Sequence, residues 1–531
     1  MDFSNGSTST LTTARSVIES GLEGTTLEIE CRLSNNLPTI VIVGFANKSV
    51  DEAKERVRGA YAGAGLRLPR KRITINLAPA DIPKDGTSYD LAMAVAIMLA
   101  AGQIGTSRLG SEVAIVGELG LDGSVRAVRG IIGKCLAAKK LGFTTLIVPS
   151  GNLAQAMLVP GLTLVPVATL HQLYLYLSGV GSLQPVATGD GVFAAPVAPA
   201  GISDLKDIVG QGQAKRALEI AAAGQHNILL SGPPGTGKSM LARALPSILP
   251  SLTKEEALEV THLHSLAMRK YEQIMFDRPV RSPHHSASDS AVLGGGLQPR
   301  PGEISLAHGG ILFLDELPEF RRSTIEALRQ PLEDRTITVT RARDSITFPA
   351  DFILVATRNP CPCGFYGSDT PCTCPAGDIS RYDKKLSGPI MDRIDLYVDV
   401  NKVDHERLLK RDNKEETSTV VARRVAQARQ RQLQRVGNGG VLNGNLTGQA
   451  VKQLVRLSPE ARSTLNTAAR NLNLSARAYM RAIRVAQTIA DLDEQNHGGR
   501  IETAHITEAI QMRPKTPAGS PVQPGAKTIA A

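Results

Sequence analysis

The chain has 531 residues, of which 42% are hydrophobic and 21% charged. This size and composition are typical of a globular protein with two or three domains, and they exclude a peptide hormone or a disulfide-stapled miniprotein. The longest apolar run, residues 91–101, is too short to cross a bilayer, and the first residues lack the basic start and apolar stretch of a signal peptide. We therefore expect a cytoplasmic protein with no membrane partner.

The net charge of +10 lies wholly in the last quarter of the chain. Residues 401–531 carry 21 basic and 11 acidic side chains, whereas residues 1–200 and 201–400 have net charges of +2 and −2. A basic segment of this kind indicates a polyanionic partner such as nucleic acid. The pattern leaves open a second interpretation, in which the charges form a solvated face of helices.

Changes of composition divide the chain into five predicted parts. These are an amino-terminal domain at 1–177, a Gly/Pro/Ala-rich linker at 178–203, a core at 204–400, a helical region at 401–512 and a disordered tail at 513–531.

The apolar pattern predicts an α/β protein with a helical carboxyl-terminal region. In the first part, β-branched runs alternate with helical stretches, which favours an α/β or α+β domain. In the core, apolar strands separated by long helical segments predict a parallel sheet covered by helices. The predicted strands are 38–43, 73–77, 145–148, 227–230, 311–314 and 352–356, and the predicted helices are 51–64, 88–101, 420–435, 459–472, 476–492 and 503–512.

The strongest motif is an uninterrupted G-x-x-x-x-G-K-[ST] segment between an apolar strand and a helical stretch. Its glycines let backbone N–H groups converge on a phosphate, its lysine brings a positive charge to the β- and γ-phosphates, and its last hydroxyl can bind Mg²⁺. The motif therefore predicts a site for ATP and Mg²⁺. Its residues are Gly232, Pro233, Pro234, Gly235, Thr236, Gly237, Lys238 and Ser239.

Polar residues at the ends of two later strands complete the predicted catalytic site. Asp315 and Glu316 directly follow the strand 311–314. After a P-loop, such a pair predicts a Mg²⁺ ligand in Asp315 and a group that orients and polarises the attacking water in Glu316. Asn359 ends the strand that begins at Phe352, from where it could contact the γ-phosphate or this water.

This order of P-loop, Asp-Glu pair and strand-end Asn, followed by an Arg-rich helical region, resembles the AAA+ ATPases. The resemblance implies a homo-oligomeric ring, expected to be hexameric, in which arginines offset the charge on the transferred phosphoryl group. It places the finger that reaches the neighbouring subunit at Arg393 and the sensor-2 arginine of the helical lid at Arg477, with Arg481 as the second choice. From spacing alone, a surface charge is the more common role for each of these arginines.

Segments between these motifs resemble the magnesium-chelatase-like ATPases of the ComM/YifB type over nearly the whole chain. Among them are RSPHHSASD from Arg281, PGEISLAH from Pro301, LRQPLE from Leu328 and NPCPCG from Asn359. The resemblance implies one hairpin before the Asp-Glu strand and another at 336–348, both directed at a central pore. Arg341 and Arg343 in the second hairpin are our candidates for contacts to DNA phosphates, although a solvated hairpin tip is an open alternative.

Four cysteines form a compact cluster in a Gly/Pro-rich segment after Asn359. Cys361, Cys363, Cys372 and Cys374 offer four thiolate ligands, which predicts a closed structural Zn²⁺ site, with free thiols as the alternative. Four histidines lack companion ligands in a recognised spacing, and we expect them to be ordinary histidines. They are His262, His264, His284 and His285.

The amino-terminal part resembles the proteolytic domain of Lon. The segments PKDGTSYD, with Ser88 at the nucleophile's place, and AAKKLGFTTLIVP carry this resemblance. A Ser-Lys dyad needs a lysine that accepts the serine proton, but Ile132 stands at the lysine's place and Lys134 is expected on another helix face. We therefore predict a Lon-like domain without peptidase activity.

The resemblance implies an ATP-driven ring motor that migrates branched DNA during recombination of incoming DNA in natural transformation. One alternative is a chelatase-type motor that remodels a partner protein for Mg²⁺ insertion. Two others are a peptidase, disfavoured by Ile132, and a nucleotide-gated scaffold with little turnover.

Overall fold

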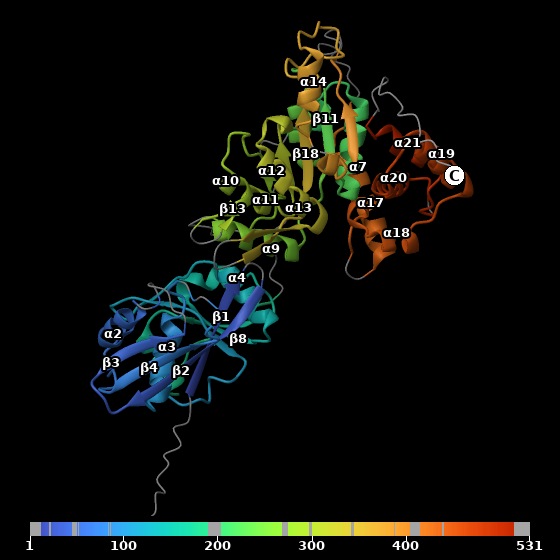
Figure 1. The fold of residues 1–531 in the computed structure, drawn as a ribbon. Helices are drawn as coiled ribbons and strands as arrows, with labels where there is room; N and C mark the ends of the chain where they lie inside the picture. Colours follow the sequence, from blue (N-terminus) through green and yellow to red (C-terminus); the bar gives the residue numbers. More distant parts are fainter. Residues whose placement is uncertain are drawn as a thin grey trace, which may run out of the picture. The chain divides into compact units, whose positions relative to one another are not determined.

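The structure is a computed structural model, and the parts of the chain that it describes form two compact units (Figure 1). Unit 1 comprises Met1–Ala195, Thr253–Phe276 and Thr340–Phe348, and unit 2 comprises Pro196–Leu252, Asp277–Val339 and Pro349–Ala531. The described residues are 12–20, 23–44, 50, 52–82, 84, 86–189, 203–267, 274–296, 300–340, 345–386, 388–403, 415–437, 440–496 and 498–514.

The first sheet of unit 1 has the strand order β1-β2-β4-β3. Strands β1 (Thr12–Ser20), β2 (Glu23–Ser34) and β4 (Arg72–Ala78) are antiparallel, and β3 (Thr39–Val43) runs parallel to β4. Helix α3 (Asp90–Ala100) packs on β1 and β2 and is buried along almost its whole length. The apolar run at 91–101 is thus a core helix.

The second sheet of unit 1 has the order β10-β9-β8-β5. Its strands are β5 (Val113–Ile115), β8 (Thr145–Pro149), β9 (Thr163–Val167) and β10 (Val186–Ala187). The edge strand β10 falls inside the predicted linker 178–203, and the buried Thr188 hydroxyl donates to the Leu162 carbonyl at 2.8 Å. The first part of that segment therefore belongs to the sheet, and residues 190–202 lie outside the described residues.

A helix from the predicted core completes unit 1. Helix α9 (Lys254–Ala267) packs on α4 (Ile131–Lys140), and Leu258 shares an apolar cluster with Ile131 and Cys135. This departs from the predicted part 204–400, because residues 253–276 are grouped with the amino-terminal domain. The sequence of α4 indicates an apolar face, but it does not indicate which distant helix packs on that face.

Unit 2 is built on a five-stranded parallel sheet of order β12-β15-β18-β11-β19 (Figure 1). Its three central strands are apolar and buried along their length, as expected for a parallel sheet covered on both faces. The strands are β11 (Ile228–Ser231), β12 (Val280–Arg281), β15 (Ile311–Leu314), β18 (Ile353–Arg358) and β19 (Leu396–Asp399).

The helical region packs directly on this core. Helices α17 (Ser418–Val436) and α20 (Ala476–Leu492) contact α7 (Gly212–Gly224), and one apolar cluster runs through all three and the sheet. Helices α18 (Gly448–Leu454), α19 (Pro459–Asn471) and α21 (Thr503–Gln511) complete the region. Together with the sheets, this arrangement confirms the predicted α/β fold class.

Two short two-stranded sheets occupy the positions of the predicted hairpins. They are β13 (Gly294–Gly295) with β14 (Arg300–Pro301), and β16 (Thr336–Thr340) with β17 (Ser345–Pro349). Arg341 and Arg343 lie outside the described residues, as does the predicted tail from residue 515 onward.

The remaining helices and strands are mostly short, and three of these helices have eight residues or more. The remaining elements are α2 (Ala53–Gly63), β6 (Glu118–Leu119), β7 (Val125–Arg126), α5 (Leu153–Ala156), α6 (Leu170–Leu177), α8 (Lys238–Ala244), α10 (Asp289–Leu293), α11 (Glu303–Leu306), α12 (Arg322–Ala327), α13 (Arg329–Asp334), α14 (Ala376–Asp383) and α15 (Gly388–Met391). Across the described ranges, no helix has both the length and the apolar composition needed to span a bilayer.

Candidate functional site

The P-loop connects β11 to α8 at the carboxyl edge of the parallel sheet. Gly235 and Gly237 have φ angles of 76° and 88°, in the left-handed region that side chains disfavour. A Cβ at Gly232 would lie 2.2 Å from the Val400 carbonyl oxygen, so this position also requires glycine. The glycines of the motif thus meet three separate backbone requirements of the loop.

Lys238 points back into this loop. Its Nζ donates to the carbonyls of Gly232 and Pro233 at 2.6 and 2.8 Å and to Asn359 Oδ1 at 3.2 Å. Burial lowers the pKa of the Lys238 ammonium, while Asp315 and Glu316 oppose that effect. The ammonium is therefore held where it could contact phosphates in the loop.

The predicted Mg²⁺ ligands, Ser239 in α8 after β11 and Asp315 after β15, meet at the carboxyl edge of the sheet. The Ser239 hydroxyl donates to Asp315 Oδ2 at 3.0 Å, and the Thr357 hydroxyl donates to Asp315 Oδ1 at 2.5 Å. A hydroxyl and a carboxylate are hard oxygen ligands, which are the type that Mg²⁺ prefers. These residues therefore fit a bound Mg²⁺ ion.

Thr357 also holds Glu316, a role that the sequence did not reveal. The Glu316 N–H donates to Thr357 Oγ1 at 2.9 Å, and Glu316 has a φ of 54°, which is uncommon for a side-chain-bearing residue. Asn359 Nδ2 donates to Glu316 Oε1 at 3.4 Å. The only sequence signal for Thr357 was a polar residue near the end of a predicted buried strand.

The two predicted arginines lie together, but at the other edge of the sheet. Arg393 precedes β19, whose first residue Leu396 pairs with Ile228, whereas the P-loop begins after Ser231 at the opposite end of β11. Parallel strands therefore place Arg393 at their amino ends and Lys238 at their carboxyl ends. Within one chain, the sheet separates the arginine from the P-loop.

The Glu333 carboxylate forms ion pairs with both Arg393 and Arg477. Glu333 Oε2 is ion-paired with Arg393 Nη2, and Glu333 Oε1 lies 3.4 Å from Arg477 Nη2. The hydrogen bond from Arg393 lowers the pKa of the Glu333 carboxyl. Arg477 remains 62% exposed, whereas Arg393 is only 10% exposed. Glu333 ends the LRQPLE segment, which marked the family but not this role.

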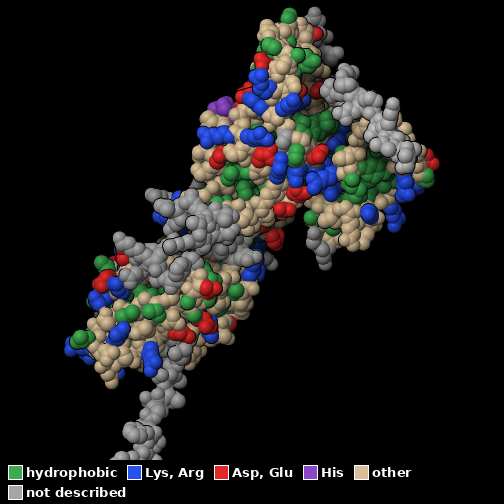
Figure 2. Space-filling model, in the orientation of Figure 1, with side chains coloured by type: hydrophobic (Ala, Val, Ile, Leu, Met, Phe, Trp, Pro, Cys, Tyr) green, Lys and Arg blue, Asp and Glu red, His purple; other side chains and the backbone are tan. Residues whose placement is uncertain are grey.

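These arginines line a basic cleft of about 440 Å³ in unit 2. Figure 2 shows Lys and Arg side chains gathered on this face of the unit. Five arginines and one acid, Glu333, line the cleft, so its lining carries an excess of basic side chains. They are Arg335, Arg393, Arg477, Arg481 and Arg484.

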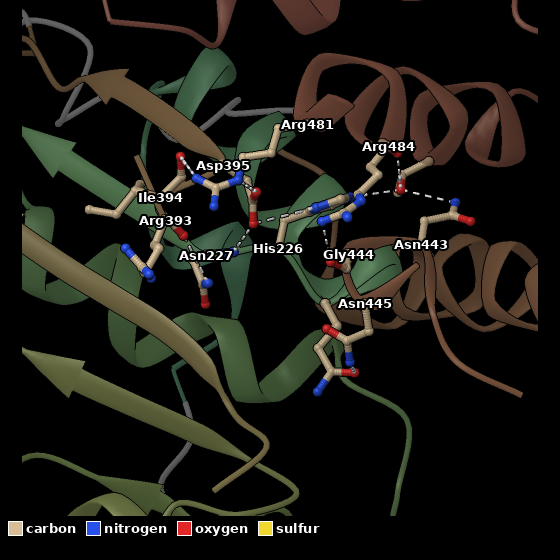
Figure 3. Close-up of polar contacts among 12 residues, drawn as sticks. His226, Asn227, Arg393, Ile394, Asp395, Asn443, Gly444, Asn445, Arg481 and Arg484 are labelled. Carbon is tan, nitrogen blue, oxygen red and sulfur yellow. Dashed lines mark hydrogen bonds and ion pairs between the residues drawn. The ribbon is translucent and has the colours of Figure 1, made fainter. Parts of the chain in front are cut away.

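Arg481, which lines this cleft, is ion-paired with the buried Asp395 (Figure 3). Its Nε lies 3.4 Å from Asp395 Oδ1, and His226 Nδ1 lies 3.7 Å from Asp395 Oδ2, which also accepts the Asn227 N–H at 3.0 Å. Burial would raise the pKa of Asp395, but His226, Arg481 and this N–H together lower it to about 2. Because Arg481 is engaged here, Arg477 is the freer of the two lid arginines.

The four predicted zinc ligands are brought together after β18. Their sulfur atoms all lie within 4.8 Å of one another, and Cys361 Sγ is 3.3 Å from Cys363 Sγ and 3.6 Å from Cys372 Sγ. Hydrogen bonds from the backbone N–H groups of Phe365 and Thr373 lower the pKa of the Cys363 thiol to about 6. In the part of the chain that the structure describes, these cysteines are the one group with metal-site geometry.

The histidines that we set aside do not join that group. His262 and His264 are buried in α9, and the rings of His284 and His285 lie 4.1 Å apart.

The lysine of the Lon-like part, Lys134, is paired with a carboxylate. Lys134 is buried, and its Nζ lies 3.3 Å from Glu19 Oε1. Burial alone would lower the pKa of Lys134, but Glu19 and Tyr89 raise it above its ordinary value. A lysine held as an ammonium cannot take a proton from Ser88. The absence of peptidase activity remains a prediction, and this geometry agrees with it.

Comparison with known proteins places this site in a family. Residues 204–408 match the family described as magnesium chelatase, subunit ChlI, residues 415–513 match its C-terminal family, and residues 29–152 match the family described as subunit ChlI of Mg-chelatase. YifB of Salmonella typhimurium is 42% identical over 93% of this chain and 95% of its own length. The chain belongs to the ComM/YifB family.

Two further relatives match this family member, one over most of its length and one over a quarter of it. Competence protein ComM of Haemophilus influenzae is 42% identical over 93% of this chain and 95% of its own length. Lon protease 2 of Bacillus subtilis is 32% identical over 25% of this chain and 26% of its own length. The family and the P-loop site together identify an AAA+ ATPase of the ComM/YifB family.

Proposed function

We propose that this ATPase is one subunit of a cytoplasmic, homo-oligomeric ring, hexameric by family resemblance, that uses ATP hydrolysis to migrate branched DNA. One observation supports assembly into a ring: Arg393 and Arg477 lie at the opposite edge of the sheet from Lys238. Within one chain, these arginines and Lys238 therefore cannot contact the same triphosphate. In a ring, the arginine edge of one copy can face the P-loop edge of the next.

The residues at the carboxyl edge perform the chemical step in this proposal. Lys238 holds the β- and γ-phosphates, and Ser239 with Asp315 holds Mg²⁺, which offsets phosphate charge when bound. Glu316 orients the attacking water and polarises it, and Asn359 fixes Glu316 relative to Lys238. Arg393 and Arg477 of the next copy stabilise the charge on the transferred phosphoryl group.

Mixing two inactive variants tests the shared site. Lys238→Ala and the double variant Arg393→Ala with Arg477→Ala are each expected to lose turnover by at least about 100-fold. In a mixed ring, some interfaces join an intact P-loop to intact arginines, so a 1:1 mixture should regain a substantial fraction of wild-type turnover. Arg381→Ala, at an exposed arginine of α14, is the matched control and should remain active alone.

If the mixture stayed as inactive as its components while its subunits exchanged, the arginines would act within their own chain or not at all. That result would contradict the shared site. Subunit exchange is checked independently by fluorescence transfer between labelled copies.

Two observations support DNA as the substrate. The chain carries its whole basic excess of +10 in residues 401–531, and one of its relatives is named a competence protein. We test this by ATPase assays with forked, four-way and single-stranded DNA. Arg341→Ala with Arg343→Ala should weaken DNA binding and reduce its salt dependence while ATP binding is unchanged.

The matches to magnesium chelatase favour a second candidate, a motor that remodels a protein partner for metal insertion. Stimulation of ATP turnover by a chelatase partner protein, with no response to any DNA, would support that candidate. Turnover that stays slow with both ligands would instead support a nucleotide-gated scaffold.

A further inference from the structure

The loop that carries the four cysteines lies against the P-loop. Gly364 has a φ of 85°, and a Cβ at this position would lie 2.6 Å from Pro234 Cδ and 3.9 Å from Asn359 Cγ. The loop therefore contacts the phosphate-binding segment closely enough to need glycine. Any group that stiffens this loop also stiffens one wall of the nucleotide site.

The same loop begins at Asn359, which joins two groups of the nucleotide site. Asn359 accepts a hydrogen bond from Lys238 Nζ at 3.2 Å and donates to Glu316 Oε1 at 3.4 Å. Cys361 follows two residues later and is buried. The position of Asn359 is thus coupled to the position of the cysteines through one intervening proline.

The sulfur atoms are arranged as ligands of one ion. In a tetrahedral site with Zn–S distances of about 2.3 Å, neighbouring sulfurs are about 3.8 Å apart. Three of the pairs lie at 3.3, 3.6 and 3.5 Å, and all six cysteines of the chain are free thiols in the structure. A set of four soft ligands selects Zn²⁺ over Mg²⁺ or Ca²⁺.

Backbone groups support the sulfurs in that arrangement. The N–H groups of Tyr366, Cys363 and Cys374 donate to Cys361 Sγ, Cys374 Sγ and Cys372 Sγ at 3.3, 3.3 and 3.4 Å. Such hydrogen bonds hold the ligand sulfurs in place and orient them toward a metal. Four ligands fill the tetrahedral positions, which is the pattern of a structural site.

We propose that Cys361, Cys363, Cys372 and Cys374 bind one Zn²⁺ ion, and that this ion braces Asn359 and the P-loop for ATP binding. The bracing part rests on the proposed function, because it assumes that the P-loop binds ATP. The metal site itself does not.

The test begins with metal content, which is independent of any ATP or DNA activity. The full-length protein is purified under reducing conditions, and its zinc is measured by mass spectrometry, with added Zn²⁺ as the probe where it is low. We expect about one zinc per chain in the wild type and at least tenfold less in Cys372→Ser with Cys374→Ser. Cys31→Ala with Cys135→Ala, which removes two thiols outside the cluster, should keep the metal.

The second measurement needs no substitution and so does not depend on how well a variant folds. Zinc is removed from the wild type with a chelator, binding of a fluorescent ATP analogue is measured, and zinc is then restored. We expect the affinity for the analogue to fall about tenfold and to recover, which is within the usual range of coupling between two sites.

Each outcome bears on one part of the proposal. A wild-type protein that binds no zinc on titration and keeps the four cluster thiols reactive would overturn the site. Zinc that binds without any change in ATP affinity would overturn the bracing. Normal zinc and ATP binding without any response to DNA would contradict the proposed function and leave this inference standing.

Discussion

Asp315 and Asp395 flank strands of the same sheet, yet their surroundings give them opposite roles. Asp315 follows β15 at the carboxyl edge and contacts the hydroxyls of Ser239 and Thr357, both of which are neutral. Its negative charge is therefore available to a cation. Asp395 lies at the amino edge, where the Arg481 guanidinium already offsets its charge and the His226 ring lies beside it. The first is suited to Mg²⁺ and the second to stabilising the fold.

Replacing Glu316 by Gln should separate ATP binding from hydrolysis. The amide keeps the shape and the hydrogen bond with Asn359, but it cannot polarise a water molecule as a carboxylate does. We expect turnover to fall by about 100-fold or more while the affinity for ATP stays within about twofold. Steady-state turnover and equilibrium binding of a fluorescent analogue measure the two effects, and a variant with full turnover would contradict the role of Glu316.

Replacing Asp395 by Asn should destabilise the protein in a pH-dependent way. The pKa of Asp395 in the folded chain is about 2, below its unfolded value of about 3.9, so its ionised form favours folding. This stabilisation, about 2 kcal/mol, is complete above the unfolded pKa and is lost as the pH falls through 2.

Urea unfolding of the wild type and of Asp395→Asn at pH 7 and pH 3 measures this difference. The gap in the free energy of unfolding should be smaller at pH 3 than at pH 7. Asp392→Asn, at a half-buried position three residues away, is the control and should change little. An equal gap at both pH values would show that the charge of Asp395 does not stabilise the fold.

At the scale of elements, the loops after the strands decide what this sheet can bind. The P-loop after β11, the Asp-Glu turn after β15 and the cysteine loop after β18 all leave the sheet at its carboxyl edge. Parallel strands bring these loops together although more than 100 residues separate the first from the last. The amino edge instead carries the arginine cleft.

Gly364→Ala tests the contact between two of these loops. A Cβ at this position would lie 2.6 Å from Pro234 Cδ, and the φ of 85° adds backbone strain of about 1 kcal/mol. We expect ATP affinity to fall several-fold and the free energy of unfolding to fall by about 1–2 kcal/mol. Gly377→Ala in α14, where no atom lies within 4 Å of the new Cβ, should leave ATP affinity unchanged and should not lower the free energy of unfolding.

At the scale of the whole molecule, the two functional edges of unit 2 face opposite ways. In the proposed ring, the arginine edge of one copy would meet the P-loop edge of the next in a head-to-tail interface. Hydrolysis would depend on assembly, whereas ATP binding to the P-loop would depend on it less.

Dilution should therefore reduce turnover per chain at constant saturating ATP. When assemblies dissociate, each P-loop loses the arginines of its neighbour, and the rate per chain should fall at least about 100-fold. Sedimentation at the same protein concentrations reports the oligomeric state. Full turnover by a monomer would contradict the shared site.

The amino-acid sequence alone was sufficient for features that depend on short segments. The P-loop at 232–239 needs glycines at particular backbone positions, and the strands 227–230, 311–314 and 352–356 are apolar because both faces of a parallel sheet are covered. Both requirements act within a few residues, so they leave a visible pattern. The family resemblance followed from the same short motifs.

Only the tertiary structure decided which distant residues meet. No local pattern could reveal that Thr357 holds Glu316, that Glu333 pairs with Arg393 and Arg477, or that α9 belongs to unit 1. These contacts join segments that are far apart in the chain, and many different residues would satisfy the local backbone at each position. The arginines and the P-loop lie at opposite edges because strand direction is a property of the whole sheet.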